Sequence, residues 1–415
     1  MLFTVLLGAY ALAALYKFFS ISRPELAIGR PLAVAYTVRV GAVLLLSLSG
    51  AAGGLRGGDE PGFVAHGQRI AGTPFGSDVW TDAISSELFK AVFASQFALF
   101  DAPQIAIRMT QVTIATAGLL LMIVAVYDLA GPRAALLAGW VLAFEPTSVF
   151  FAGIIHKEPL MLLAEGLVAY GGAQLWASGA LIGVLPMATG CLVGIATRRY
   201  AGLFLVSAAV FIVLHAAFRV RRESGIRSLG LLFAVAIALS VSLPTMIYAT
   251  SESELDKLQT SQDANASDEK ANLSLERVDY SSRSAVLENL PVRLGDVLTK
   301  PYPWQLQNAS QRLGLLGTLF FWTVLVLFIQ AAYRLRGSVM DRAGPLLYPA
   351  LAVLVAYSLS AGNAGTAFRY RTHVVVMVIC IMVVLRTHFE ARVRAAPGTH
   401  GRATDRRRDP IIAAA

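Results

Sequence analysis

The chain has 415 residues, of which 56% are hydrophobic and only 15% are charged, and its mean hydropathy is +0.62. Soluble domains carry about a quarter charged residues, so this composition excludes an ordinary soluble protein and predicts an all-α polytopic integral membrane protein. The formal net charge is +9. Its arginines cluster in short segments between apolar runs and in the C-terminal tail, which suits cytoplasmic anchoring and makes a nucleic-acid partner unexpected.

Apolar stretches of roughly 17 to 25 residues predict about eleven transmembrane helices. The first lacks the basic residues that precede a signal peptide's apolar core, so we count it as a span. Cys191 and Cys380 lie inside apolar runs, which predicts core packing and neither disulfides nor zinc ligands. The expected spans are 2–19, 32–54, 105–127, 134–155, 158–177, 179–197, 200–219, 228–249, 313–335, 344–361 and 373–389.

The short basic segments indicate which ends of the spans face the cytoplasm. "SRPELAIGR", "VRRESGIR", "RLRGSVMDRAG" and the tail fall on one side if the helices alternate, and the positive-inside rule makes that side cytoplasmic. The opposite, outer side then receives residues 55–104, 156–159, 198–200, 250–312 and 362–372.

This orientation divides the chain into four parts. Residues 1–249 form an N-terminal transmembrane catalytic module with an outer loop at 55–104, and residues 250–312 form an extracytoplasmic loop. Residues 313–389 are C-terminal transmembrane helices, and 390–415 are a basic, disordered cytoplasmic tail. Residues 84–100 have near-helical apolar spacing and predict an interfacial helix, whereas residues 251–274 are expected to be mobile and solvated.

Basic residues in the short outer turns run against the positive-inside tendency. An anionic ligand at the outer surface would account for them, since arginine presents a planar fork suited to phosphate oxygens. The alternative is that they reach lipid phosphates, form an interfacial Arg/Tyr belt or pair with nearby carboxylates. The residues concerned are Lys157, Arg198, Arg199, Arg369 and Arg371.

"GLRGGDEPGFVAHGQRIAG" places Asp59 and Glu60 in a glycine-rich turn at the outer end of the second span. A carboxylate there could act as the general base that takes a proton from an acceptor hydroxyl as it attacks an anomeric carbon. The alternative is a polar helix end followed by a solvated loop. Asp78 and Asp82, four residues apart, are reserve candidates for the base or for a metal site.

"FEPTSVFFAGIIHKEPLMLLAEG" contains further ionisable residues. Glu145 lies inside an expected span, where a charge is costly unless it faces a polar cavity or partner. Glu158 and Glu165 are two helical turns apart and share one helix face, and Glu158 lies at the positive end of its helix dipole. His156 and Lys157 could contact a phosphate or orient Glu158, although a histidine at a helix end can equally be structural.

At these positions the chain resembles the GT-C glycosyltransferases, polytopic enzymes that use polyprenyl-phosphate sugars, and within them the protein mannosyltransferase and aminoarabinose transferase type (family 39). The resemblance is carried over residues 32–200 by the outer "DE", the interfacial helix and the "AFEP…HKEPLMLL" hairpin. In that family an acidic residue of the first outer loop is the catalytic base. The resemblance therefore implies a GT-C-like fold with Asp59 as the base and Glu60 adjoining.

The expected function is inverting transfer of a sugar from a polyprenyl-phosphate donor to a cell-envelope glycan, lipid or protein, on the extracytoplasmic face of the cell membrane. The sequence specifies no cofactor, and the need for a divalent metal ion is left open. Two alternatives remain: a polysaccharide polymerase using undecaprenyl-pyrophosphate-linked substrates, and a flippase or other transporter of lipid-linked sugars. ATP-driven transport is not expected, because the sequence has no Walker loop.

Overall fold

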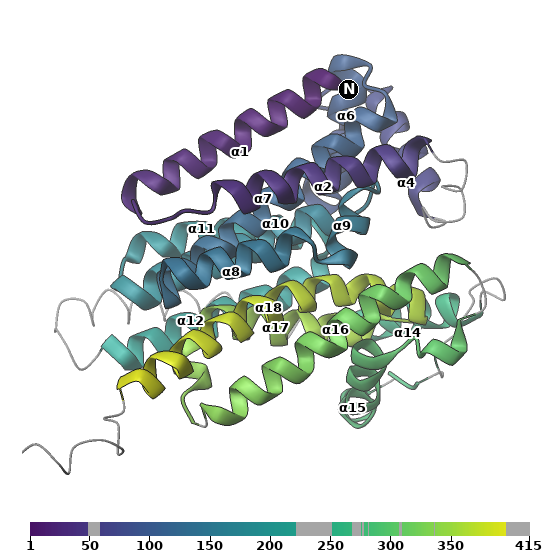
Figure 1. Ribbon diagram of the computed structural model, residues 1–415. Helices are drawn as coiled ribbons and strands as arrows, with labels where there is room; N and C mark the ends of the chain where they lie inside the picture. Colours follow the sequence, from purple (N-terminus) through teal and green to yellow (C-terminus); the bar gives the residue numbers. More distant parts are fainter. Residues whose placement is uncertain are drawn as a thin grey trace, which may run out of the picture.

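The computed structural model describes residues 1–48, 59–220, 251–267, 275, 278–280, 282–306, 309–335 and 337–395. In these ranges the protein is helical, with no β-strand. The elements (Figure 1) are α1 (Leu2–Ser22), α2 (Gly29–Leu48), α4 (Asp59–Ala71), α5 (Asp78–Ser86), α6 (Leu88–Phe100), α7 (Gln104–Ala130), α8 (Pro132–Ala143), α9 (Pro146–Ala152), α10 (Glu158–Ser178), η1 (Leu181–Gly183), α11 (Val184–Thr197), α12 (Arg199–Val220), α14 (Glu252–Ser267), α15 (Arg283–Thr299), η2 (Pro303–Gln305), α16 (Ala309–Arg334), α17 (Val339–Ser360) and α18 (Ala364–Ala395).

The expected all-α polytopic fold is confirmed in the described ranges, which overlap all but one of the eleven predicted spans. Eight helices in the described ranges are long and apolar enough to cross a membrane, namely α1, α2, α7, α10, α12, α16, α17 and α18. The expected span at 228–249 lies outside the described residues, and 179–197 forms η1 and the short helix α11. The expected span at 134–155 is bent by 61° between α8 and α9, which together would make a ninth.

The bend between α8 and α9 has a local cause. Pro146 opens α9, and Glu145 precedes it as the N-cap residue, accepting hydrogen bonds from the backbone N–H of Thr147 at 2.9 Å and of Ser148 at 2.5 Å. Proline favours the first turn of a helix and disrupts a helix interior. Glu145 is therefore a helix cap at a break, and not a charge in the middle of a continuous span.

Two ends of the helical bundle can be distinguished in Figure 1. The first, which we call the loop-rich end, carries α4, α6, α14 and α15 beside the break between α9 and α10. The second, the arginine-rich end, carries the turn between α1 and α2, the turn between α16 and α17, and the end of α18.

Three short helices form a cap at the loop-rich end. Residues 59–71, expected to begin as a glycine-rich turn, form α4, and the single interfacial helix expected at 84–100 is divided at Glu87 into α5 and α6. After this division α6 contributes side chains to two clusters, one of which it shares with α5 through Ala91 and Ala94. Trp80 of α5 packs with Ile70, whereas Phe89 and Phe93 of α6 pack with residues of α4, α7 and α10.

Residues 252–267, expected to be mobile and solvated, form α14. Leu258 of α14 is buried and packs with Tyr280 and with Leu359 of α17, so tertiary contacts stabilise a helix that composition alone did not predict. α15 packs on α17 and α18 at the same end.

A close helix crossing joins α7 and α10, the most extensively packed pair of the fold. A Cβ atom added at Gly118 would lie 2.6 Å from the backbone of Leu162, and one added at Gly166 would lie 2.5 Å from the carbonyl oxygen of Gly118. Small residues commonly allow transmembrane helices to approach this closely. The position of α10, and of everything attached to its first turn, depends on this contact.

We expect Gly118→Ala and Gly166→Ala to destabilise the protein by about 1–3 kcal/mol each, because neither backbone can move away without repacking the bundle. Gly41→Ala in α2 is the matched control, since its Cβ would have no neighbour within 4 Å. Thermal unfolding of the purified protein in detergent measures the difference. Equal midpoints for Gly118→Ala and Gly41→Ala would contradict the packing argument.

Candidate functional site

A buried carboxylate collects charged groups from three segments of the chain. Glu158 is the first residue of α10, followed by Pro159, and is fully buried. Its Oε1 atom lies 2.6 Å from Nη2 of Arg198, at the junction of α11 and α12, and 3.4 Å from Nε of Arg369 in α18. The structure thus brings together three residues that the sequence singled out separately.

Two tyrosines hold the guanidinium of Arg198 in place. Tyr357 of α17 and Tyr370 of α18 are stacked, with ring centroids 4.4 Å apart. Arg198 lies over both rings, 4.7 Å from the centroid of Tyr370 and 5.5 Å from that of Tyr357. Arginine stacks favourably on aromatic faces, so these contacts fix the direction in which its remaining N–H groups point.

Residues 153–157, between α9 and α10, add a histidine and a lysine to this cluster. The ring of His156 contacts Glu158, and its Nε2 atom lies 2.6 Å from Nη1 of Arg369. The Lys157 ammonium lies 4.6 Å from the ring centroid of Phe89 in α6. Burial lowers the pKa of Lys157 to about 8. The ammonium is therefore held against an apolar, aromatic surface.

We refer to His156, Lys157, Glu158, Arg198 and Arg369 as the Glu158 cluster. It contains three basic side chains of ordinarily high pKa and one carboxylate, so its formal charge is positive even with His156 neutral. Guanidinium and ammonium groups are the side chains that proteins use for phosphate oxygens. The arrangement is suited to an anion at the loop-rich end.

Glu60, at the start of α4, lies beside this cluster. Its Oε1 atom accepts a hydrogen bond from Nε of Arg108 at 2.8 Å and another from the backbone N–H of Ile155 at 3.2 Å. Glu60 is only 3% exposed, so it ties α4 to α7 and to the segment before α10. Phe63, also in α4, has its ring centroid 5.1 Å from that of His156. Two side chains of α4 therefore hold this helix against the segment that carries His156.

Asp59 is the first residue of α4, directly before Glu60. Its side chain lies outside the described part of the chain. Because consecutive Cα atoms are about 3.8 Å apart, the backbone of Asp59 lies next to the carboxylate-bearing residue that contacts Ile155. Asp59, the base expected from the sequence, therefore adjoins Glu60, whose side chain contacts the residue before His156.

Arg371 does not join the Glu158 cluster. Successive residues of an α-helix are rotated by about 100°, so Arg369 and Arg371 leave α18 in nearly opposite directions. Arg371 is fully buried, donates to the backbone carbonyl of Lys300, and lies 3.4 Å from the hydroxyl of Thr318 in α16. It fastens the segment after α15 to α16 and α18.

The remaining sequence candidates lie outside the Glu158 cluster. Arg199 is exposed at the start of α12, and Asp78 and Asp82 are exposed on α5. Glu145 is buried as the cap of α9, where the neighbouring Ser148 accepts a hydrogen bond from Nη2 of Arg39 at 2.6 Å. Within the described ranges, no three His, Cys, Asp or Glu side chains gather as metal ligands would.

Two partners of buried acids near the site were among the contacts that the sequence analysis missed. Arg108 was not considered as the partner of Glu60, and His373 of α18 was not considered as the partner of Glu165. The Nδ1 atom of His373 lies 3.0 Å from the Oε1 atom of Glu165. Both members of the second pair are fully buried. Each missed residue is ionisable and lies inside an apolar run, the criterion that identified Glu145.

Comparisons with known proteins assign no family to this chain. No protein-family model matches the sequence, and no curated protein matches it. Among solved structures, the chain is similar to the archaeal oligosaccharyltransferase AglB from Archaeoglobus fulgidus, with a TM-score of 0.46 and 14% sequence identity. That structure is of a complex with an inhibitory peptide and a dolichol-phosphate. The match covers 92% of this chain and 53% of the archaeal one, so the chain spans about half of that protein's length.

Proposed function

We propose that the chain is a membrane glycosyltransferase that moves a sugar from a polyprenyl-phosphate donor to a cell-envelope acceptor, with inversion at the anomeric carbon. The observation that carries this proposal is the Glu158 cluster, an excess of fixed cations beside the acidic start of α4. The arginine-rich end bears the short basic turns, so the positive-inside rule favours the loop-rich end as extracytoplasmic.

The donor phosphate would bind to Arg198, Arg369 and Lys157. Negative charge grows on the phosphate as its bond to the sugar breaks, and cations already held in position stabilise that charge most effectively. Glu158 would act as a positioning residue, since it contacts both guanidinium groups. The polyprenyl chain would extend along the apolar outer surface of the helices.

Asp59 would act as the general base. The acceptor hydroxyl attacks the anomeric carbon, its proton passes to the Asp59 carboxylate, and the bond from that carbon to the phosphate oxygen breaks. The departing polyprenyl phosphate keeps the electron pair. Inversion requires attack on the face opposite the phosphate. The base would come from α4, whereas the cations come from the residues that precede α10 and α12 and from α18.

One observation favours a transporter as a second candidate. Glu165 and His373 form a fully buried pair between α10 and α18, and ionisable pairs inside a membrane often mark ion or proton pathways. A transporter would move a lipid-linked sugar without making a glycosidic bond.

Asp59→Asn should abolish transfer of a labelled sugar from a polyprenyl-phosphate donor by the purified protein in liposomes, with a loss of about 100-fold or more, because the base is removed. Asp101→Asn is the matched control, because Asp101 is an exposed acid at the end of α6 in the same cap. Unchanged turnover in Asp59→Asn would exclude it as the base. Movement of the donor without bond formation would favour the transporter, and transfer only from a pyrophosphate-linked donor would favour the polymerase.

Arg198→Ala and Arg369→Ala should each raise the KM for the donor roughly 10- to 150-fold, the range expected for losing a hydrogen bond between charged groups. Arg312→Ala, which removes an exposed arginine at the start of α16, should leave the KM for the donor unchanged. Steady-state kinetics at several donor concentrations make the comparison. Equal KM values for all three variants would remove the cluster from donor binding.

Donor binding should also weaken as the pH rises through about 8. The lysine ammonium loses its proton above that pH because burial lowers the pKa of Lys157 to about 8, so a cation needed by the phosphate disappears. The affinity should fall by up to about tenfold per pH unit. Lys157→Arg keeps its charge throughout this range and should bind the donor with little change from about pH 7 to about pH 9.5; an identical decline in both proteins would assign the effect to another group.

A further inference from the structure

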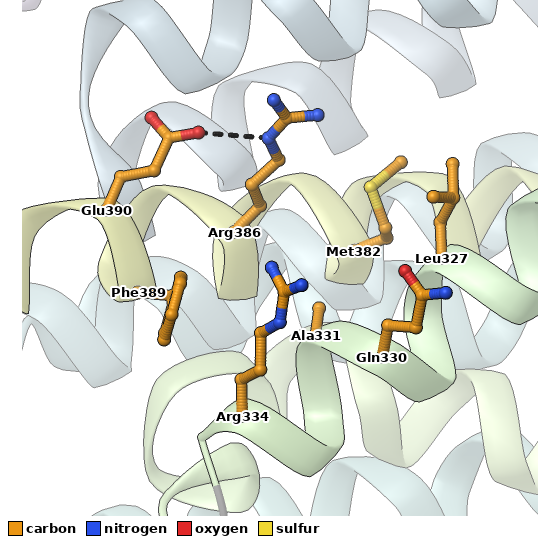
Figure 2. A pocket seen from close by; sticks show the side chains of 8 residues that line it. All are labelled: Leu327, Gln330, Ala331, Arg334, Met382, Arg386, Phe389 and Glu390. Carbon is orange, nitrogen blue, oxygen red and sulfur yellow. Dashed lines mark hydrogen bonds and ion pairs between the residues drawn. The ribbon is translucent and has the colours of Figure 1, made fainter. Parts of the chain in front are cut away.

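A groove with a volume of about 170 Å³ lies between α16 and α18, toward the arginine-rich end. Figure 2 shows Leu327 and Met382 toward one end of it and Phe389 and Glu390 toward the other, with Arg334 and Arg386 between them. It is remote in the fold from the Glu158 cluster, which lies near the opposite end of α18. The proposed transferase chemistry makes no use of it.

One part of the groove is apolar and opens where lipid would cover the bundle. α16 is among the least buried of the spanning helices, and its side chains Val326 and Ile329 are 53% and 56% exposed. Exposed apolar side chains on a spanning helix are in contact with acyl chains once the protein is in a bilayer. Leu327 and Met382 therefore give the groove an apolar wall beside the hydrocarbon.

The other part of the groove is positively charged. The guanidinium of Arg334 lies 5.2 Å from the ring centroid of Phe389. Arg386 donates to Glu390 at 2.9 Å, and Glu390 also lies 3.7 Å from Arg394. The three arginines outnumber the carboxylate, so a positive charge remains that an anionic group could neutralise.

The order of these features along the helices matches one kind of ligand. Leu327 and Arg334 are seven residues apart, or about 10 Å along the axis of α16. The apolar wall and the charged part of the groove are therefore separated along the membrane normal, as the acyl chain and the headgroup of a lipid are. We propose that the groove binds an anionic phospholipid, with an acyl chain along Leu327 and Met382 and the phosphate between Arg334 and Arg386. Basic pockets between spanning helices are known to hold such headgroups.

The test is a native mass spectrometry titration of the full chain in detergent with phosphatidylglycerol and with phosphatidylcholine of the same acyl chains. Wild type should bind phosphatidylglycerol more tightly. The double variant Arg334→Gln/Arg386→Gln should lose about thirtyfold in affinity for phosphatidylglycerol, from the contribution of each basic residue near a membrane surface, and should keep its affinity for phosphatidylcholine. Both arginines are exposed, so the fold should be unaffected.

Two further variants separate this groove from general surface charge. Arg133→Gln removes an exposed arginine at the start of α8 and should leave binding unchanged. Gln330→Trp fills the groove while keeping its arginines and should weaken phosphatidylglycerol binding. Equal affinity of wild type for the two lipids, a loss in Arg133→Gln as large as in the double variant, or full binding by Gln330→Trp would each overturn the proposal.

Discussion

A charge buried among apolar helices must be paired, and the pairing of Glu158 organises the loop-rich end of this protein. Removing a carboxylate from water costs several kcal/mol unless opposite charges and hydrogen bonds replace the lost hydration. Glu158 meets this requirement with Arg198, at the junction of α11 and α12, and with Arg369 of α18. The same carboxylate thus stabilises the junction of α10, α12 and α18 and keeps two guanidinium groups close together.

Similar pairs connect the rest of this end to the bundle. Glu60 joins α4 to α7 through Arg108, and Glu165 joins α10 to α18 through His373. Arg371 instead donates to a backbone carbonyl and a hydroxyl. These contacts place the short cap helices against the spanning helices, so that the start of α4 lies beside the cations that we propose to bind a phosphate.

The opposite end of α18 follows a different arrangement. There the arginines are exposed, and they line a groove that is partly apolar instead of surrounding a buried carboxylate. One helix therefore carries basic residues in two environments: at its start they are enclosed and paired, and near its end they face the surface. This difference in burial separates the proposed reaction site from the proposed lipid site.

The helical class and most of the spans could be predicted from the amino-acid sequence, because apolar length and composition decide which segments can cross a bilayer. The same pattern identified Lys157, Glu158, Arg198 and Arg369 as unusual. Which of these residues contact one another was decided only by the tertiary structure. His156 and Arg369, for example, are in contact although they are 213 residues apart in the sequence. Helix rotation separated Arg371 from Arg369, and packing made helices of α4 and α14, because neither long-range contacts nor the direction of a side chain is contained in a local apolar pattern.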